Sequence, residues 1–443
     1  MQTLYPDYYA QFRCTADKCP ITCCQEWKIG VDANTNRKWK KLQAPETVPE
    51  QKKNLSAYTI KKDGQRVIGL DSDHRCPFLN SEKLCRLVVA YGDKVLSETC
   101  TTFPREEHRF PTHTEKMLMP CCPAVIDLWN KQKSLHFPNV SDALSDTDAT
   151  GTSVLFLLRE KLLNLLDDSS RTIEEELLES FYILQELYQH QPLTKELLED
   201  YFSVKELGNA IAEVELPPLD LINECNELLQ DLSVNYQKEG LYQDTLNPIL
   251  ALAEEISEAL SDSTGNPDDT KAYESTLLEQ WKQFTQYLSP YEPLLRNFLR
   301  NEIFSDLLLP DSDLENVLVQ MQWIALEYAS IRHSIFLRWM LDGTDANVSE
   351  ISYDHVDKPS DVLEAGQEVK VKVLNVDPEH QRLGLSMKAL EERPKDEENN
   401  GNENRGRRRP RRNNNRNFMN NAPEEESGFS MGDLIGDQLK GLK

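Results

Sequence analysis

The chain has 443 residues, of which 75 are acidic and 49 basic, for a formal net charge of −26. This length predicts two or more domains. So acidic a surface repels nucleic acid and anionic membranes and favours a cationic partner such as a lysine-bearing protein, although solubility alone also explains the charge. No run of about 18 apolar residues occurs, so no membrane span is expected. The first ten residues also lack the features of a signal peptide, and we therefore expect a cytoplasmic protein.

Cysteines are concentrated near the N-terminus, because only Cys225 of the ten lies beyond residue 122. The other nine are predicted to ligate a metal centre: Cys14, Cys19, Cys23, Cys24, Cys76, Cys85, Cys100, Cys121 and Cys122. A chain that turns within a few residues can direct several thiolates at one ion or cluster about 2.3 Å away. Zinc and an iron-sulfur cluster use the same thiolate ligands, so both remain open. A disulfide framework fits less well, because the count is odd and an oxidising compartment is required.

Residues 1–130 are predicted to form this cysteine-cluster, metal-binding domain from short elements and turns. The polar stretch Asn80 to Lys83 predicts a turn that brings Cys76 and Cys85 back toward each other. Cys121 and Cys122, between two prolines, close the segment.

Residues 150–342 show helical periodicity, with apolar residues at three- and four-residue spacing. The expected helices span 153–167, 172–189, 193–214, 219–237, 245–261, 271–288 and 292–309. A last helix is expected to begin at a capping box of Ser312 and Glu315 and to run to about Met340. No repeat of fixed length is evident, so the pattern predicts a helical bundle, with Cys225 in its core.

The composition changes again after residue 343. Val369, Val371 and Val373 alternate with lysines, residues 375–381 form a turn, and residues 382–387 read as a second strand, which predicts a β hairpin. Residues 391–443 are rich in arginine and asparagine and are predicted to be disordered. The arginine run at 405–412 either contacts RNA phosphates or belongs to a solvated tail.

Several pieces of residues 1–340 occur in an order that resembles a known family. The N-terminal pieces are Tyr5-Pro-Asp-Tyr-Tyr9 with Phe12-Arg13-Cys14, Cys19 with Cys23-Cys24 and Trp27, Cys76-Pro-Phe-Leu79 with Leu84-Cys85, Cys100 with Phe103-Pro104-Arg105, and Cys121-Cys122. The helical pieces are Asn297-Phe298, Asn301-Glu302-Ile303-Phe304 and Tyr328 to Arg332. Together they resemble the bacterial flagellin lysine-N-methylase family. The resemblance implies methyl transfer from S-adenosylmethionine to flagellin lysines, with an iron-sulfur cluster, or alternatively zinc, in the thiol site.

A methyl transfer of this kind requires particular side chains. The lysine must lose a proton before it attacks, and the candidate bases near the cysteines are Glu26, Tyr91, Glu98, His74 and His108. No glycine-rich loop follows a strand. Radical-enzyme cysteine spacing is also unmet, because it would need a cysteine in place of Glu26. If the chain is a methyltransferase, an unusual donor site is therefore implied, which the cysteine segment and the helices would build jointly.

Three further groups of residues are candidates for the donor site. Arg105, which follows Pro104, is expected to bind the carboxylate of the donor. Asn297 and Asn301 lie one helical turn apart and either contact the donor or cap backbone groups. Arg332 and His333 interrupt an apolar stripe, and either line a site between domains or pair with acidic neighbours.

The C-terminal stretch resembles a different family, on the pieces Gly366-Gln-Glu-Val-Lys-Val-Lys-Val373 and Val376-Asp-Pro to Arg382-Leu-Gly-Leu-Ser-Met387. They are similar to the latter half of the OB-fold RNA-binding domain of the largest small-subunit ribosomal protein. Asp377 and Arg382 match polar positions of its RNA face. The first two strands, which carry the aromatic residues that stack on bases, have no counterpart before residue 343. Residues 343–390 are therefore expected to form only a partial OB fold.

The expected fold class is mainly α, with a cysteine-rich metal-binding segment, a helical bundle, a partial OB-fold hairpin and a disordered tail. The leading hypothesis is a flagellin lysine methyltransferase. The alternative is a non-catalytic metal-binding module that residues 344–443 tether to RNA or the ribosome. Deleting those residues is expected to separate the two hypotheses.

Overall fold

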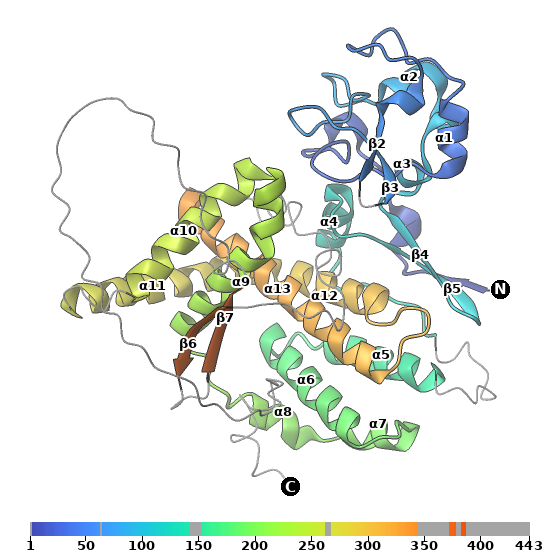
Figure 1. Ribbon diagram of the computed structural model, residues 1–443. Coiled ribbons are helices and arrows are strands. Elements are labelled where there is room, and N and C mark those ends of the chain that lie inside the picture. The colour runs from blue at the N-terminus through green and yellow to red at the C-terminus, as the bar shows by residue number, and fades with distance from the viewer. Residues whose placement is uncertain are drawn as a thin grey trace, which may run out of the picture. The chain divides into compact units, whose positions relative to one another are not determined.

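The computed structural model describes residues 2–62, 64–140, 152–261 and 267–343, together with two short strands near the C-terminus (Figure 1). The chain divides into two compact units, residues 1–367 and 368–443. In the described ranges no helix is both long and apolar enough to cross a bilayer.

The N-terminal segment is built from short elements, as the sequence predicts. Its strands are β1 (Gln2–Leu4), β2 (Thr59–Lys62), β3 (Gln65–Ile68), β4 (Arg105–Arg109) and β5 (His113–Leu118). Its helices are α1 (Ala33–Trp39), α2 (Arg86–Tyr91), α3 (Glu98–Thr102) and α4 (Pro123–Asn130), with 3-10 turns at Tyr9–Gln11, Ala16–Lys18, Leu55–Tyr58 and Asp93–Val95. Strand β5 lies between β1, which is parallel to it, and β4, which is antiparallel, while β2 and β3 form a separate hairpin.

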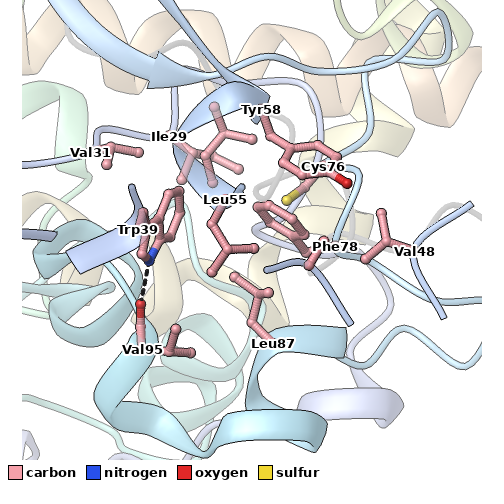
Figure 2. Close-up of a cluster of buried hydrophobic side chains, with 12 residues drawn as sticks. Ile29, Val31, Trp39, Val48, Leu55, Tyr58, Cys76, Phe78, Leu87 and Val95 are labelled. Carbon is pink, nitrogen blue, oxygen red and sulfur yellow. Dashed lines mark hydrogen bonds between the residues drawn. The ribbon is translucent and has the colours of Figure 1, made fainter. Parts of the chain in front are cut away.

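A hydrophobic cluster holds these short elements together. Trp39, Tyr58 and Phe78 are almost fully buried in it, and the Trp39 indole donates a hydrogen bond of 2.7 Å to the Val95 carbonyl (Figure 2). The rings of Trp39 and Phe78 meet in a T-shaped contact, with their centroids 5.8 Å apart. Cys76 is part of the same cluster. A predicted metal ligand is therefore fixed by the apolar core of the segment.

The middle of the chain is helical, and most of the expected helices are confirmed within a few residues. The observed helices are α5 (Thr152–Leu165), α6 (Ile173–Gln189), α7 (Lys195–Phe202), α8 (Lys205–Ile211), α9 (Pro218–Glu239), α10 (Gln243–Ser261), α11 (Pro267–Leu288), α12 (Glu292–Asp306) and α13 (Leu314–Asp342), with a 3-10 turn at Ser289–Tyr291. Cys225 is buried on α9, as expected for a core residue.

Two details of the helical prediction were wrong. The single helix expected at 193–214 is two, because α7 ends at Phe202 and α8 begins at Lys205. The capping box of α13 is formed by Asp313 and Asn316, not by Ser312 and Glu315. Asp313 accepts from the Asn316 amide at 2.9 Å, and the Asn316 side chain accepts from the Asp313 amide at 3.0 Å. An aspartate directly before the first helical turn caps as well as a serine one residue earlier, so the pattern alone permits both.

Helix α12 is buried along almost its whole length and packs against α13, α4, α5 and β5. Its polar side chains bind the N-terminal segment. Asn301 accepts a hydrogen bond from the Tyr8 hydroxyl and donates to the Leu118 carbonyl at 3.3 Å. Asn297 donates to the carbonyls of Trp129 and Gln132, at 3.2 and 2.9 Å. These bonds attach the cysteine segment to the helices.

A buried ion pair reinforces this attachment. Both Arg159 on α5 and Glu115 on β5 are at most 1% exposed. The two guanidinium nitrogens donate to the two carboxylate oxygens at 2.8 and 2.5 Å. Burial raises the pKa of Glu115, but the charge and hydrogen bonds of Arg159 outweigh it and lower that pKa to about 2. Arg159 also donates to the Phe304 carbonyl of α12 at 2.9 Å, so one side chain joins a strand and two helices.

The second unit contains the predicted hairpin, β6 (Lys372–Asp377) with β7 (Arg382–Ser386). The two strands are antiparallel, and Asp377 pairs with Arg382. The first strand continues through three residues that were expected to be turn, because the register places Val376 opposite Leu383 and so extends the ladder. Residues 344–371 and 387–443, including the arginine run, lie outside the described residues.

Replacing Glu115 with glutamine should destabilise the protein strongly, because a single partner removed from a buried pair leaves an unpaired charge. We expect a loss of roughly 3–5 kcal/mol in the free energy of unfolding, measured by urea denaturation. The contribution of Glu115 is complete above its ordinary pKa and is lost as pH falls toward about 2. The wild-type protein should therefore lose more stability than the variant on acidification.

The matched control is Glu107→Gln on β4. Glu107 pairs with Arg109 and Lys116 at the surface, where an ion pair contributes less than about 1 kcal/mol. Equal losses in the two variants would contradict a special role for the buried pair.

Candidate functional site

A cavity of about 630 Å³ lies where most of the predicted metal ligands meet. Eight of the nine N-terminal cysteines line it: Cys14, Cys19, Cys23, Cys24, Cys85, Cys100, Cys121 and Cys122. The ninth, Cys76, is buried in the hydrophobic cluster. Aromatic and charged side chains complete the lining, among them Trp27, Phe103, Tyr242, Lys83, Arg105 and Asp93.

The first cysteine loop is shaped by contacts from other parts of the segment. The Lys83 ammonium donates to the carbonyls of Cys19 and Pro20, at 2.9 and 3.0 Å. The Trp27 indole donates to the Cys23 carbonyl at 2.6 Å, and its ring lies 5.0 Å from that of Phe103. The loop is thus held by backbone contacts that leave its thiols directed at the cavity.

The predicted turn between Cys76 and Cys85 is confirmed. The Asn80 side chain accepts hydrogen bonds from the amides of Glu82 and Leu84, at 2.9 and 2.8 Å. A β-bridge joins Leu79 to Cys85 just beyond the turn. The Cys76 amide also donates to the Cys24 carbonyl at 2.7 Å. The turn therefore brings cysteines from two distant loops together.

Four thiols form a group that we call the core tetrad: Cys24, Cys76, Cys85 and Cys100. Burial raises the pKa of the Cys76 thiol, and the other three thiols raise it further. Burial also raises the pKa of Cys100 to about 11, with contributions from Cys24 and Cys85. All four lie in, or pack against, the hydrophobic cluster.

Three other thiols form a second group, which we call the edge triad: Cys14, Cys19 and Cys122. Burial raises the pKa of Cys122 to about 12, and the Cys19 and Cys14 thiols contribute to the shift. Burial likewise raises the pKa of Cys19, with a contribution from Cys14. Cys14 itself is exposed, so this group reaches the surface.

Two of these cysteines lie at the starts of helices. Cys85 and Cys122 occupy the N-cap positions of α2 and α4, and neither side chain accepts a capping hydrogen bond there. Burial raises the pKa of each thiol, and the nearby amides of the first helical turn lower it: Leu87 and Val88 for Cys85, and Ala124 and Val125 for Cys122. A position at a helix start favours the thiolate form of a cysteine.

The spacing of the thiols bears on the kind of metal. Four thiolates on one zinc ion, each about 2.3 Å from it, have sulfur atoms about 3.8 Å apart. In the described part of the chain no three thiols have sulfur atoms all within 4.8 Å of one another. One ligand atom from each of three other residues does lie within this distance of the other two, namely Glu106, His108 and Asp306. The sulfur atoms of the thiols are thus farther apart than one zinc ion requires. Thiolates on separate irons of a cluster also lie farther apart than thiolates on one ion.

Left-handed backbone conformations gather at this cavity. Ala16, Lys83 and Tyr242 line it with φ angles of 51°, 56° and 53°, and Glu26, at 67°, contacts Tyr242. Residues other than glycine rarely adopt this region, and such strain concentrates at functional sites. The pattern supports the cavity as the functional centre.

Arg105, the residue expected to bind the donor carboxylate, lies at the cysteine cavity. It lines the cavity, and its guanidinium lies 4.9 Å from the centre of the Phe12 ring. It also lines a neighbouring hollow of about 570 Å³, together with Glu98, Asp32 and Trp27. Arg105 can therefore present its charge to a bound anion at either opening.

The five candidate bases are dispersed. The Glu26 carboxylate accepts a hydrogen bond of 3.0 Å from the Tyr242 amide, and Glu98 borders the neighbouring hollow. Tyr91 donates to the Gln43 carbonyl at 3.0 Å and is largely exposed. His108 contacts Glu106 at 3.4 Å. None of these four residues lines the cysteine cavity, and His74 does not line it either.

The other candidates have structural contacts. Asn297 and Asn301 bond to backbone groups and to Tyr8, which favours the capping alternative over donor binding. Arg332 pairs with Glu174 at 3.2 Å, which is its acidic-neighbour alternative. His333 contacts Asn226 at 2.6 Å and is fully buried, and burial lowers its pKa to about 3.

Sequence reasoning missed Tyr242, Lys83 and Asp93 as cavity residues. Tyr242 belongs to the loop between α9 and α10, more than a hundred residues after the last N-terminal cysteine. No local pattern connects that loop to the thiols, although Gly240 marks it as a tight, left-handed helix end. Only the folded structure brings it to the cavity.

The helical part of the chain is similar to known proteins. Residues 159–354 match the FliB lysine N-methylase C-terminal domain family. The predicted resemblance is confirmed. The lysine-N-methylase of Salmonella typhimurium is 28% identical over 177 residues, which is 36% of this chain and 40% of that protein. The flagellar biosynthetic protein FliU of Salmonella muenchen is 28% identical over 131 residues, 27% of this chain and 72% of FliU. The chain thus spans about 40% of the length of the Salmonella lysine-N-methylases it matches.

The second predicted resemblance is also confirmed, since residues 347–388 match the S1 RNA binding domain. The small ribosomal subunit protein bS1 of Streptococcus pneumoniae is 48% identical over 100 residues, 22% of this chain and 25% of that protein. The Bacillus subtilis homologue is 42% identical over 98 residues, 22% of each chain. No solved structure matches the chain.

Substitutions of Glu26 can test its structural contact with the Tyr242 amide. In Glu26→Ala the Tyr242 amide loses its acceptor, and we expect its hydrogen exchange to become about tenfold faster. Glu26→Gln keeps an acceptor oxygen and should preserve the protection. Mass spectrometry of the peptide that contains Tyr242 measures both. Equal acceleration in the two variants would contradict the hydrogen bond as the source of protection.

Proposed function

We propose that this protein is a lysine N-methyltransferase that acts on flagellin, uses S-adenosylmethionine and holds an iron-sulfur centre in its N-terminal cysteines. The observation that carries the proposal is the cavity lined by eight cysteines together with cationic and aromatic side chains. The similarity of the chain to lysine-N-methylases and to the flagellar biosynthetic protein FliU supports lysine methylation and a flagellar substrate.

The residues present fit an iron-sulfur centre. The donor set is entirely thiol, two of the thiols lie at helix starts, and the sulfur spacing exceeds what one zinc ion requires. When bound, such a centre supplies electron transfer or a Lewis-acidic iron. The protein's own contribution is to fix the thiols and to keep them at the cavity wall.

The cavity also suits a methyl donor of the proposed kind. Its volume lies within the range of small-molecule sites, roughly 300–1,000 Å³. Arg105 and Lys83 provide positive charge for the donor carboxylate, and an arginine can bind a carboxylate through two parallel hydrogen bonds. Trp27 and Phe103 offer aromatic faces to an adenine ring or a sulfonium.

The transfer itself requires a neutral lysine. Its nitrogen lone pair forms a bond to the methyl carbon, the bond from that carbon to sulfur breaks, and the sulfur leaves with the electron pair as a neutral thioether. The proton released from the lysine passes to a base of the protein. Tyr242 and Asp93 line the cavity and join Glu26 and Glu98 as candidates for that base.

The net charge supports a lysine-bearing substrate. An excess of 26 negative charges attracts cationic groups and raises their local concentration. This attraction acts at long range, and salt screens it.

A second candidate function rests on the S1 match at residues 347–388. In this alternative the cysteine segment is a non-catalytic metal module, and the C-terminal stretch tethers it to RNA or the ribosome. Asp377 and Arg382, which match polar positions of the family's RNA face, are partners in the register of the β6–β7 ladder. The missing first strands and the acidic charge favour the methyltransferase.

Protein purified without oxygen should contain iron and acid-labile sulfide in equal amounts and little zinc. It should transfer methyl groups from S-adenosylmethionine to lysines of purified flagellin, read out by mass spectrometry. A truncation that lacks residues 344–443 should keep this activity, because α13 ends at Asp342 and the truncation leaves every described helix intact. Metal without methyl transfer, combined with RNA binding that the truncation abolishes, would support the tethered module instead.

Replacing Arg105 with alanine should weaken donor binding by about tenfold to a hundredfold, the effect of losing a hydrogen bond to a charged group. The value of KM for S-adenosylmethionine should rise by this factor, while KM for flagellin changes little. Arg109→Ala is the matched control, since Arg109 lies on the same strand, pairs with Glu107 and is largely exposed. An unchanged KM in Arg105→Ala would remove Arg105 from the donor site.

A further inference from the structure

We propose that Glu106, His108 and Asp306 form a binding site for a divalent metal ion that joins strand β4 to the end of helix α12. One possible ligand atom from each of these residues lies within 4.8 Å of those from the other two. None of the three residues lines the cavity that holds the cysteines. The inference therefore depends neither on a metal centre held by thiols nor on methyl transfer.

Two of the three ligands come from the buried face of β4. Glu106 and His108 are two residues apart on this strand, so their side chains point to the same side of the sheet. The residues that alternate with them along β4 are exposed. Their partners in the register of β5 are Met117 and Glu115, and both are fully buried. The side of β4 that carries the two ligands is therefore turned toward the protein interior.

The third ligand is the last residue of α12. Asp306 is 8% exposed, and α12 packs against β5, the strand next to β4. The carboxyl end of a helix carries a partial negative charge, so an aspartate there is unfavourable unless a cation is close. The last turn of α12 contains no basic residue. Arg159 bonds to the Phe304 carbonyl in this turn, but both of its terminal nitrogens also bind Glu115. A metal ion would offset the remaining negative charge.

The imidazole of His108 has the position and the free capacity of a ligand. Its side chain is 12% exposed, and its Nε2 atom lies 3.4 Å from a carboxylate oxygen of Glu106. Adjacent ligand atoms that each lie about 2.1 Å from one ion are about 3 Å apart, so the two side chains are close enough to share an ion. The Nδ1 atom of His108 is buried and has no hydrogen-bond partner in the described part of the chain. Such an atom needs an explanation, and a bound ion is one.

The ligand types indicate the class of metal. Imidazole suits zinc and iron, whereas carboxylates suit manganese and magnesium, so the mixed set favours a divalent ion that accepts both nitrogen and oxygen. Glu106 and Asp306 have further interactions in the fold. These are compatible with coordination, because carboxylates that ligate a metal are hydrogen-bonded as well.

A metal at this position would act as a cross-link. It would fix β4 relative to α12 through bonds that are stronger and more directional than packing. Strand β4 begins at Arg105, which lines the cysteine cavity. The ion would therefore help to hold one wall of that cavity in place without contacting its contents.

The test measures Mn²⁺ binding by the full-length protein after a chelator has removed loosely bound metal. Mn²⁺ suits oxygen and nitrogen ligands and avoids thiolates. Its electron paramagnetic resonance signal in solution weakens as the ion binds, so a titration gives both the number of sites and Kd. The variants are His108→Gln, Asp306→Asn and Glu106→Gln. Glu107→Gln is the matched control, because Glu107 lies on the exposed side of the same strand and pairs with Arg109 and Lys116.

Wild-type protein and Glu107→Gln should bind about one Mn²⁺ per chain. Each of the three site variants should raise Kd by more than about a hundredfold, since the loss of a ligand costs more than the loss of an outer hydrogen-bond partner. Pulsed electron paramagnetic resonance of the bound ion should show coupling to an imidazole nitrogen in the wild type, and this coupling should be absent in His108→Gln. Mn²⁺ should also raise Tm of the wild type and the control but not of the site variants.

Three results would overturn the proposal. Binding to the wild type only at millimolar Mn²⁺ would mean that these residues form no specific site. An unchanged Kd in His108→Gln would place the bound ion elsewhere. An equal rise of Kd in Glu107→Gln would attribute the binding to surface charge. Circular dichroism confirms folding of each variant, and if Asp306→Asn does not fold, His108→Gln and Glu106→Gln still decide the outcome.

Discussion

The buried polar contacts of α12 are the constraint on which the rest of this structure depends. An amide side chain that is out of contact with water must find hydrogen-bond partners, and Asn297 and Asn301 find theirs in the backbone of the cysteine segment and in Tyr8. The guanidinium of Arg159 adds a bond to the Phe304 carbonyl of α12 and two to Glu115. A segment of short elements is thereby attached to the helices through buried hydrogen bonds and an ion pair.

The shape of the cavity depends on these contacts between α12 and the cysteine segment. Strand β5 and helix α4, which follow one another in the chain, both pack on α12, and Cys121 and Cys122 lie between them. On another side of the cavity, the loop after α9 contributes Tyr242 to the lining. The Tyr242 amide donates a hydrogen bond to the Glu26 carboxylate. The thiols therefore occupy a wall that both the N-terminal segment and the helices support.

Much of the fold could be predicted from the sequence, because the signals concerned are local. Helical periodicity located the helices from α5 to α13, and the Asn80 turn followed from its polar residues. The prediction failed where the same local sequence permits two structures. At residues 193–214 the helix breaks at Ser203 and Val204, and at the start of α13 either of two neighbouring residues can cap the helix. It also took Asn297 and Asn301 as possible donor ligands, since a one-turn spacing looks alike whether the partner is a ligand or a distant backbone carbonyl. The grouping of the thiols and the presence of Tyr242 at the cavity depend on contacts far apart in sequence, for which one chain offers no pattern.

The order of these parts along the chain sets the order in which the protein can be built. All nine N-terminal thiols precede α5, so they leave the ribosome before any of the helices on which their segment rests. Chains generally fold from the N-terminus during synthesis. Helix α12, against which β5 and α4 pack, begins only at Glu292. Some 170 further residues, from Cys122 to Glu292, must therefore be synthesised after the last N-terminal thiol before that helix begins. During this interval the segment is held by its own hydrophobic core alone, so the residues around Phe78 are as important for the growing chain as for the finished structure.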